Sequence, residues 1–145
     1  MAQGKQQGPK GIDPLSKWLG FQWEAPNRIR LEIRDDHINQ AGLLSGAVSY
    51  ALIDYCMGST LWIERKGEER IATISISINY VQTAREGTIV CESTLDRRND
   101  RVAVLRSEVR HEDGRIVATA VGSFAIFPKE RLRGQERRRD YIPGD

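Results

Sequence analysis

A single carboxylate lies in the middle of the most apolar segment of the chain. Between Ile38 and Ile63, Asp54 is the only acidic or basic side chain. Burial disfavours the charged form of a carboxylate unless a donor or a cation stabilises it. Asp54 is therefore either a structural carboxylate that receives hydrogen bonds or an acid or base that takes part in a reaction.

Potential hydrogen-bond donors lie a few residues before Asp54. Gly42, Ser45 and Gly46 form a small-residue approach to a predicted helix, whose first N–H groups have no partner within the helix and whose dipole favours negative charge. Asn39 could add a side-chain amide. A carboxylate on a helix, with amide donors near the helix start, is suited to hydrolysis of an activated acyl group.

Other reactive side chains give weaker signals. Cys56 and Cys91 are 35 residues apart and form no CxxC pair, which argues against a zinc site or a disulfide and favours a reducing cytoplasm. We therefore expect no metal and interpret Cys56 as a small core residue. His37, beside Asp35 and Asp36, is expected to face solvent.

Arginine side chains surround one predicted turn. Arg97, Arg98 and Arg101 flank the sequence DRRND, and guanidinium groups bind phosphates well. They are candidates for binding the phosphate groups of a substrate. An exposed turn, on which arginines simply face solvent, explains their presence equally.

The element that carries Asp54 has a clear helical pattern. Starting from Leu44, apolar residues recur at offsets 3, 4, 7, 8 and 11, and further apolar residues project from the opposite side. Such a helix is buried on most sides. Ser45 is the predicted N-cap, and the helix should run over residues 45–65.

Strands are predicted before and after this helix. The ranges are 28–34, 72–81, 87–95, 101–110 and 115–127. In the range 72–81, Ile74, Ile76, Ile78 and Tyr80 alternate with polar residues, which predicts that these four share one face. The segment 16–26 is expected to form one or two helical turns or a cap. The pattern predicts an α+β fold in which a curved antiparallel sheet of five to six strands wraps around one long central helix.

The ends of the chain differ from this domain. We expect a flexible leader over residues 1–14, one domain over 15–128 and a charged tail over 129–145. The leader lacks the apolar region of a secretory signal, and Asp54 argues against a membrane span, so we expect a cytoplasmic protein. Residues 128–140 carry six Lys or Arg against three acids, without interleaved aromatic residues, so we expect no nucleic-acid binding.

The run from Asn39 through Gly42, Ser45 and Gly46 to Asp54 resembles the N-x-x-G-x-x-H-G-G-x-x-x-x-x-x-D motif of PaaI-like acyl-CoA thioesterases. These belong to the hotdog-fold (4-hydroxybenzoyl-CoA thioesterase) superfamily. The predicted order of elements is also similar to that of this family. The resemblance extends over roughly residues 12–128 and includes ISINYVQTAREG and EDGRIVATAVGSFAIF.

The resemblance implies roles for individual residues. Asp54 would be the catalytic carboxylate, acting as general base or as nucleophile, and the N–H of Gly46 would polarise the thioester carbonyl. Asn39 would lie near the scissile bond, and Thr73 would orient the water from the neighbouring subunit. Active sites would then lie at the interface of a homodimer or a dimer of dimers, with acyl-CoA as substrate and no further cofactor.

Two positions depart from the family motif. Ser45 stands where the family usually has His, and Ala47 replaces the second Gly. Ser45 can cap the helix or donate one hydrogen bond, but it provides no imidazole. The resemblance therefore implies hydrolysis of a small aryl- or fatty acyl-CoA, with acyl-CoA binding without turnover as the alternative. A hotdog dehydratase would require a suitably placed His, which is lacking.

The acyl pocket is expected to depend on packing across subunits. Its candidate lining residues are Tyr50, Met57, Leu61, Trp62 and Tyr80.

Overall fold

The computed structural model describes residues 13–128. The elements, in chain order, are α1 (Pro14–Leu19), β1 (Gln22–Ala25), β2 (Arg28–Glu32), a 3-10 turn (Asp35–His37), α2 (Gly46–Ile63), β3 (Arg70–Tyr80), β4 (Thr88–Arg98), β5 (Val102–His111) and β6 (Ile116–Phe127). The segment expected to form a helical turn or cap forms α1 and also the short strand β1. Nearly all of the predicted leader and the whole predicted tail lie outside the described residues.

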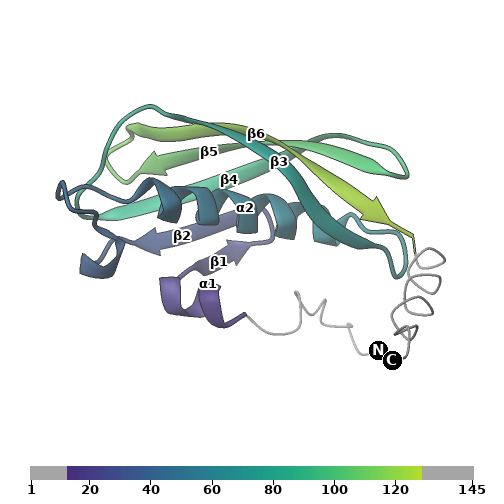
Figure 1. Cartoon of the computed structure of the whole chain (residues 1–145), viewed down its shortest axis with the longest axis horizontal. Helices are drawn as coiled ribbons and strands as arrows, with labels where there is room; N and C mark the ends of the chain where they lie inside the picture. Colours follow the sequence, from purple (N-terminus) through teal and green to yellow (C-terminus); the bar gives the residue numbers. More distant parts are fainter. Residues whose placement is uncertain (1–12, 129–145) are drawn as a thin grey trace, which may run out of the picture.

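The sheet has six antiparallel strands in the order β1-β2-β4-β5-β6-β3, and α2 lies along one of its faces. Figure 1 shows the strands curving over this helix. The α+β hotdog prediction is confirmed. Strand β3 directly follows α2 in the sequence but pairs with β6 at one edge of the sheet, so its outer backbone groups have no strand partner among the described residues.

Helix α2 begins and ends close to the predicted residues. Ser45 is its N-cap, and the Ser45 hydroxyl accepts a hydrogen bond of 3.3 Å from the N–H of Ala47. The side chains that face the sheet are fully buried, and they include Leu52, Ile53, Met57 and Leu61. Burial of these side chains holds the helix against the curved sheet, because each such side chain contributes about 1.5–3 kcal/mol when it leaves water.

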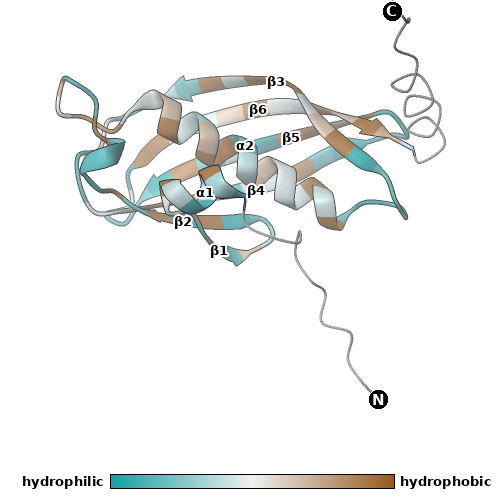
Figure 2. Ribbon diagram, turned by 60° about the horizontal axis from the view of Figure 1, so that its bottom comes forward, coloured by the Kyte–Doolittle hydropathy of each residue, from teal (hydrophilic) through white to brown (hydrophobic). Residues whose placement is uncertain are grey.

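Within residues 13–128, no other helix or strand covers the opposite face of α2. Ala47 and Tyr50 are exposed, and Ala51, Asp54 and Gly58 are half-buried. In Figure 2 the helix runs along one side of the sheet, so this face of α2 points away from the strands. An apolar helix with one uncovered face is unusual in an isolated domain.

A β-bulge changes which face of β3 carries each residue. Thr73 pairs with Phe124 but Ser75 pairs with Ser123, so Ile74 is an extra residue in the ladder. Downstream of the bulge the pairing is regular to Tyr80. The prediction that Ile74 shares a face with Ile76 and Tyr80 is therefore wrong. Ile74 is 57% exposed, and Thr73 takes the helix-facing position instead.

Within residues 13–128, neither helix has both the length and the apolar character that crossing a bilayer requires.

Candidate active site

The Asp54 carboxylate is held by strand β3. The hydroxyl of Thr73 donates a hydrogen bond of 2.6 Å to Asp54 Oδ1. Oδ2 accepts no hydrogen bond from any residue in the described range. Asp54 is half-buried on the uncovered face of α2, so one oxygen is positioned while the other can accept a proton.

Thr73 is thus engaged by its own chain. The resemblance implied that this residue would serve the site from the neighbouring subunit. In the structure the Thr73 hydroxyl positions the Asp54 of the same chain, and the bulge at Ile74 is what turns it toward the helix.

The first residue of α2 presents an unused backbone donor. The N–H of Ser45 donates to His37 O and the N–H of Ala47 to the Ser45 hydroxyl. The N–H of Gly46, between them, has no acceptor among the described residues. A free N–H at a helix start can stabilise a developing negative charge.

Asn39 lies beside this helix start in a closed loop. Its Oδ1 accepts hydrogen bonds from the N–H groups of Ala41 (2.9 Å) and Leu43 (3.2 Å). Gly42, at φ +76°, makes the tight return of this loop, a backbone conformation that favours glycine. Because Oδ1 is occupied, the NH₂ group of Asn39 is the part left to meet a ligand.

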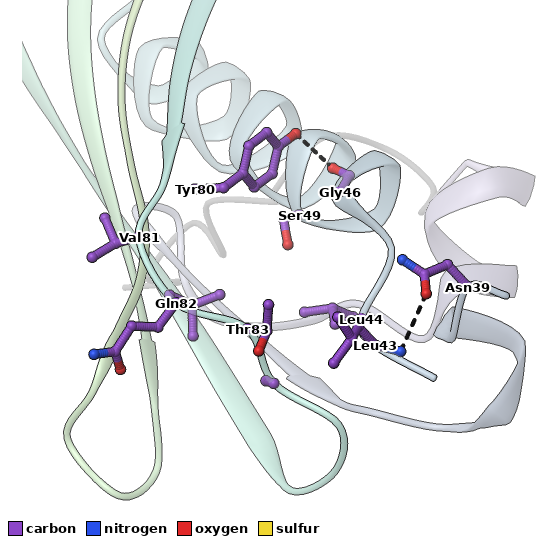
Figure 3. A pocket seen from close by; sticks show the side chains of 11 residues that line it. Asn39, Leu43, Leu44, Gly46, Ser49, Tyr80, Val81, Gln82 and Thr83 are labelled. Carbon is purple, nitrogen blue, oxygen red and sulfur yellow. Dashed lines mark hydrogen bonds between the residues drawn. The ribbon is translucent and has the colours of Figure 1, made fainter. Parts of the chain in front are cut away.

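A cavity of about 300 Å³ opens between the start of α2 and the end of β3. In Figure 3 the side chains of Asn39, Leu44, Ser49 and Tyr80 surround it, with the segment after β3 on the opposite side. The full lining is Asn39, Leu43, Leu44, Gly46, Ser49, Tyr80, Val81, Gln82, Thr83, Ala84 and Val117. Half of the lining side chains are apolar, and polar groups lie both at the helix start and on the segment after β3.

Only one of the expected acyl-pocket residues lines this cavity. Tyr80 does so, and its hydroxyl donates to Gly46 O at 2.9 Å. Met57 and Leu61 are completely buried in the core between α2 and the sheet. Tyr50 and Trp62 lie elsewhere on α2 and do not line the cavity.

Asp54 and Gly46 cannot act on one thioester from the same chain. They are eight residues apart on one helix, which corresponds to about 12 Å along its axis. A base and an oxyanion donor that serve one carbonyl group must each lie within about 3 Å of the reacting atoms. Each chain therefore presents two separate groups of candidate residues, which we call half-sites. One contains Asp54 and Thr73, and the other contains Gly46 and Asn39 beside the cavity.

The three arginines proposed for phosphate binding are not equivalent. Arg98 forms an ion pair of 2.9 Å with Glu69 and donates to Glu64 O at the end of α2. Both side chains of this pair are largely buried. Arg98 is therefore already occupied, whereas Arg97 and Arg101 are exposed and have no ion pair in the described part of the chain. All three lie at the end of α2 opposite the cavity.

His37 is buried, so the expectation that it faces solvent is wrong. Its Nδ1 accepts from the N–H of Arg34 at 3.1 Å, and its Nε2 lies 2.8 Å from Leu19 O. These bonds require a neutral ring with the proton on Nε2, and burial lowers the pKa of His37. Sequence patterns did not reveal this role, because both partners are backbone groups.

Residues 13–128 contain no cluster of three or more His, Cys, Asp or Glu side chains that could hold a metal ion. Cys56 and Cys91 are free and buried, which confirms that Cys56 is a core residue.

The sequence profile of the Thioesterase superfamily matches residues 41–118, which is more than half of the chain. The chain belongs to the Thioesterase superfamily. The matched region of this thioesterase-superfamily chain includes Gly46, Asp54, Thr73 and Tyr80, and it begins two residues after Asn39.

Individual relatives are more distant. The medium/long-chain acyl-CoA thioesterase YigI of Salmonella typhimurium is 28% identical over 97 residues, and the match covers 61% of this chain. The chain spans 63% of the length of that relative. The Escherichia coli protein of the same name is 27% identical over 97 residues, with the same coverage of each chain.

Solved structures share the fold of this thioesterase-superfamily chain. A Bacillus halodurans protein solved with CoA gives a TM-score of 0.76 at 19% identity, covering 81% of this chain and 78% of that one. A conserved protein of Pseudomonas aeruginosa gives a TM-score of 0.73 at 24% identity, covering 80% and 95%. These similarities confirm the hotdog architecture.

Proposed function

We propose that the protein hydrolyses acyl-CoA thioesters. The observation that carries this proposal is the Thr73 hydroxyl bonded to Asp54 Oδ1 on an uncovered helix face. This contact fixes a carboxylate where a second molecule can approach it. Family membership and the names of the relatives agree with a thioesterase activity.

The proposed reaction uses only water and the two half-sites. Asp54 Oδ2 takes a proton from water as the water oxygen bonds to the thioester carbonyl carbon. The carbonyl oxygen becomes an oxyanion, which the Gly46 N–H and the Asn39 amide stabilise. The carbon–sulfur bond then breaks, the proton on Asp54 passes to the CoA sulfur, and the products are a carboxylic acid and CoA. Direct attack by Asp54 through an anhydride is the other route that this geometry permits.

The site requires two copies of the chain. Since the half-sites of one chain are about 12 Å apart along α2, Asp54 and Thr73 of one copy would face Gly46 and Asn39 of the other. The edge strand β3 and the uncovered face of α2 are the surfaces for such a homodimer. Two sites per dimer follow from its symmetry. Arg97 and Arg101 would bind CoA phosphates only if the second copy brings them to the cavity.

Thiol release from a panel of aryl- and fatty acyl-CoAs tests the proposal. We expect Asp54→Asn to lower kcat about 100-fold or more while the protein remains folded, because the amide cannot take the proton. Wild-type turnover in this variant would contradict the mechanism.

Acyl-CoA binding without turnover is the second candidate. It is favoured by one observation, that the Ser45 hydroxyl caps α2 at the position where the family usually has His. Thermal stabilisation of the wild type by acyl-CoA with no thiol release would support it.

A further inference from the structure

Tyr80 is the aromatic residue of the cavity that the proposed reaction does not use. It ends strand β3, and downstream of the bulge its side chain points toward α2. Its hydroxyl donates to Gly46 O at 2.9 Å. Figure 3 shows this bond and the tyrosine ring beside the helix start.

The tyrosine ring fills the space next to Gly46. A Cβ placed on Gly46 would lie 3.2 Å from Cζ and 3.3 Å from Cε1 and Oη of Tyr80. These separations are shorter than ordinary van der Waals contacts between carbon atoms. Glycine is therefore the residue that fits beneath this ring, and the space beside the Gly46 Cα is narrow.

The position of the ring depends mainly on its hydroxyl bond. The Tyr80 residue is 57% exposed, so packing covers less than half of it. The bond to Gly46 O is the hydrogen bond that its side chain makes to the described residues. Tyr80 is thus attached to the element that carries the oxyanion donor, while one side of its ring is open to a ligand.

We propose that Tyr80 determines acyl-group selectivity, and that the substrates are unbranched aliphatic acyl-CoAs rather than aroyl-CoAs. This inference rests on the proposed function. In an aroyl thioester the ring is bonded directly to the carbonyl carbon, so it must lie beside Gly46, where Tyr80 already is. In an aliphatic thioester the first atom is a methylene group, which fits the narrow space and leads to the apolar walls formed by Leu44, Ala84 and Val117.

The cavity also predicts how binding depends on chain length. Each methylene group that the cavity buries should tighten binding about fourfold, from about 0.8 kcal/mol per group. A volume of about 300 Å³ is at the lower end for ligand pockets, so this gain should stop at a modest chain length.

The test compares octanoyl-CoA with benzoyl-CoA in the full-length wild type, Tyr80→Ala and Tyr80→Phe. Tyr55→Phe is the matched control, because it removes a tyrosine hydroxyl that lies near Asp13 and does not line the cavity. The readouts are kcat and KM from thiol release, and Kd for non-hydrolysable ketone analogues in which a methylene replaces the sulfur. The Kd values of the analogues measure acyl-group selectivity independently of turnover.

We expect the wild type to prefer the octanoyl compound at least about tenfold in kcat/KM and in Kd, the range that steric selection supplies. Tyr80→Ala should reduce this ratio about tenfold. Tyr80→Phe should give a ratio between those of the wild type and Tyr80→Ala, since the ring remains but the bond to Gly46 O that positions it is lost. Tyr55→Phe should match the wild type.

Other results separate the two proposals. An unchanged ratio in Tyr80→Ala, or a wild-type preference for benzoyl, overturns the role of Tyr80 and leaves the hydrolase intact. Absence of thiol release in the wild type overturns the proposal that the protein is a hydrolase. The ratio of the Kd values of the two analogues then tests whether Tyr80 determines acyl-group selectivity. If neither analogue binds, both proposals are wrong.

Discussion

The two residues at the centre of the site, Asp54 and Thr73, differ in how they could be identified. Asp54 was evident from the sequence, because it is the one carboxylate within a long apolar segment. Thr73 has no such signal, and alternation along its strand would place it on the face that points away from the helix. Only the resemblance to a known motif singled it out, and the structure then showed its bond to Asp54.

His37 shows the limit of sequence analysis at this scale. A histidine beside two aspartates is ordinarily solvated, yet this one is 0% exposed. Its ring links the end of α1 to the loop before α2, and its carbonyl accepts the N–H of Ser45. The start of α2, including the free N–H of Gly46, therefore depends on a neutral imidazole.

This dependence predicts a loss of stability in acid. Burial lowers the pKa of His37 in the folded protein, so the unfolded chain binds a proton first as pH falls below about 6.5. The contribution of neutral His37 to the free energy of unfolding is complete above that pH. It is lost as the pH falls from about 6.5 to the lower pKa of the folded protein, by at most about 1.4 kcal/mol per pH unit.

Denaturant unfolding at several pH values between 7.5 and 5 measures this effect. His37→Gln should be less stable than the wild type at pH 7.5 and should lose less free energy of unfolding on acidification. Equal pH dependence of the free energy of unfolding in the two proteins would show that His37 does not contribute to the loss of stability in acid.

At the scale of elements, the long helix and most of the strands followed from periodicity. The boundaries of α2 agree with the predicted range to within two residues at each end, since its N-cap and its apolar surface are local features of the sequence. The short strand β1 was not predicted as a strand, because a four-residue strand has little pattern of its own.

The bulge in β3 could not be predicted from the sequence for a different reason. Ile74 and Ile76 are both apolar residues in an alternating run, and nothing local distinguishes them. Pairing with β6, a partner distant in the sequence, inserts the extra residue. Gly122 pairs with Ile76, close to the bulge, and a Cβ on Gly122 would lie 2.7 Å from Met57 Sδ, so this part of the sheet lies close to α2.

Matched substitutions test the bulge. We expect Ile74→Thr to change the free energy of unfolding by no more than about 0.5 kcal/mol, as is usual for surface positions. Ile76→Thr should cost at least about 1 kcal/mol more, because Ile76 packs against the core. Similar losses at both positions would mean that the strand alternates regularly and that Thr73 does not face Asp54.

At the scale of the whole molecule, the fold leaves open the same two surfaces that the proposed reaction requires. Strand β3 is an edge, and the Asp54 side of α2 is uncovered. The sequence predicted an interface only in general terms, from a spare edge and from a resemblance. Under the proposed mechanism, the separation of Gly46 from Asp54 along α2 makes this interface necessary, since one chain holds both half-sites but cannot join them.

Two variants can each remove one half-site. Asp54→Asn disables the carboxylate. Gly46→Pro removes the backbone N–H, and proline is accepted at the first position of a helix. The extended Ser45 before it is also compatible with proline. Gly46→Ala is the control, because it adds the same Cβ beside Tyr80 but keeps the N–H.

The most direct test of the account is thiol release by mixed oligomers of Asp54→Asn and Gly46→Pro, unfolded together in equal amounts and refolded. Each variant alone should be inactive, and the mixture should recover about one quarter of wild-type activity, because half of the dimers are mixed and each has one intact site of two. Gly46→Ala alone should be more active than Gly46→Pro. A mixture no more active than the separate variants would contradict a site shared between two chains.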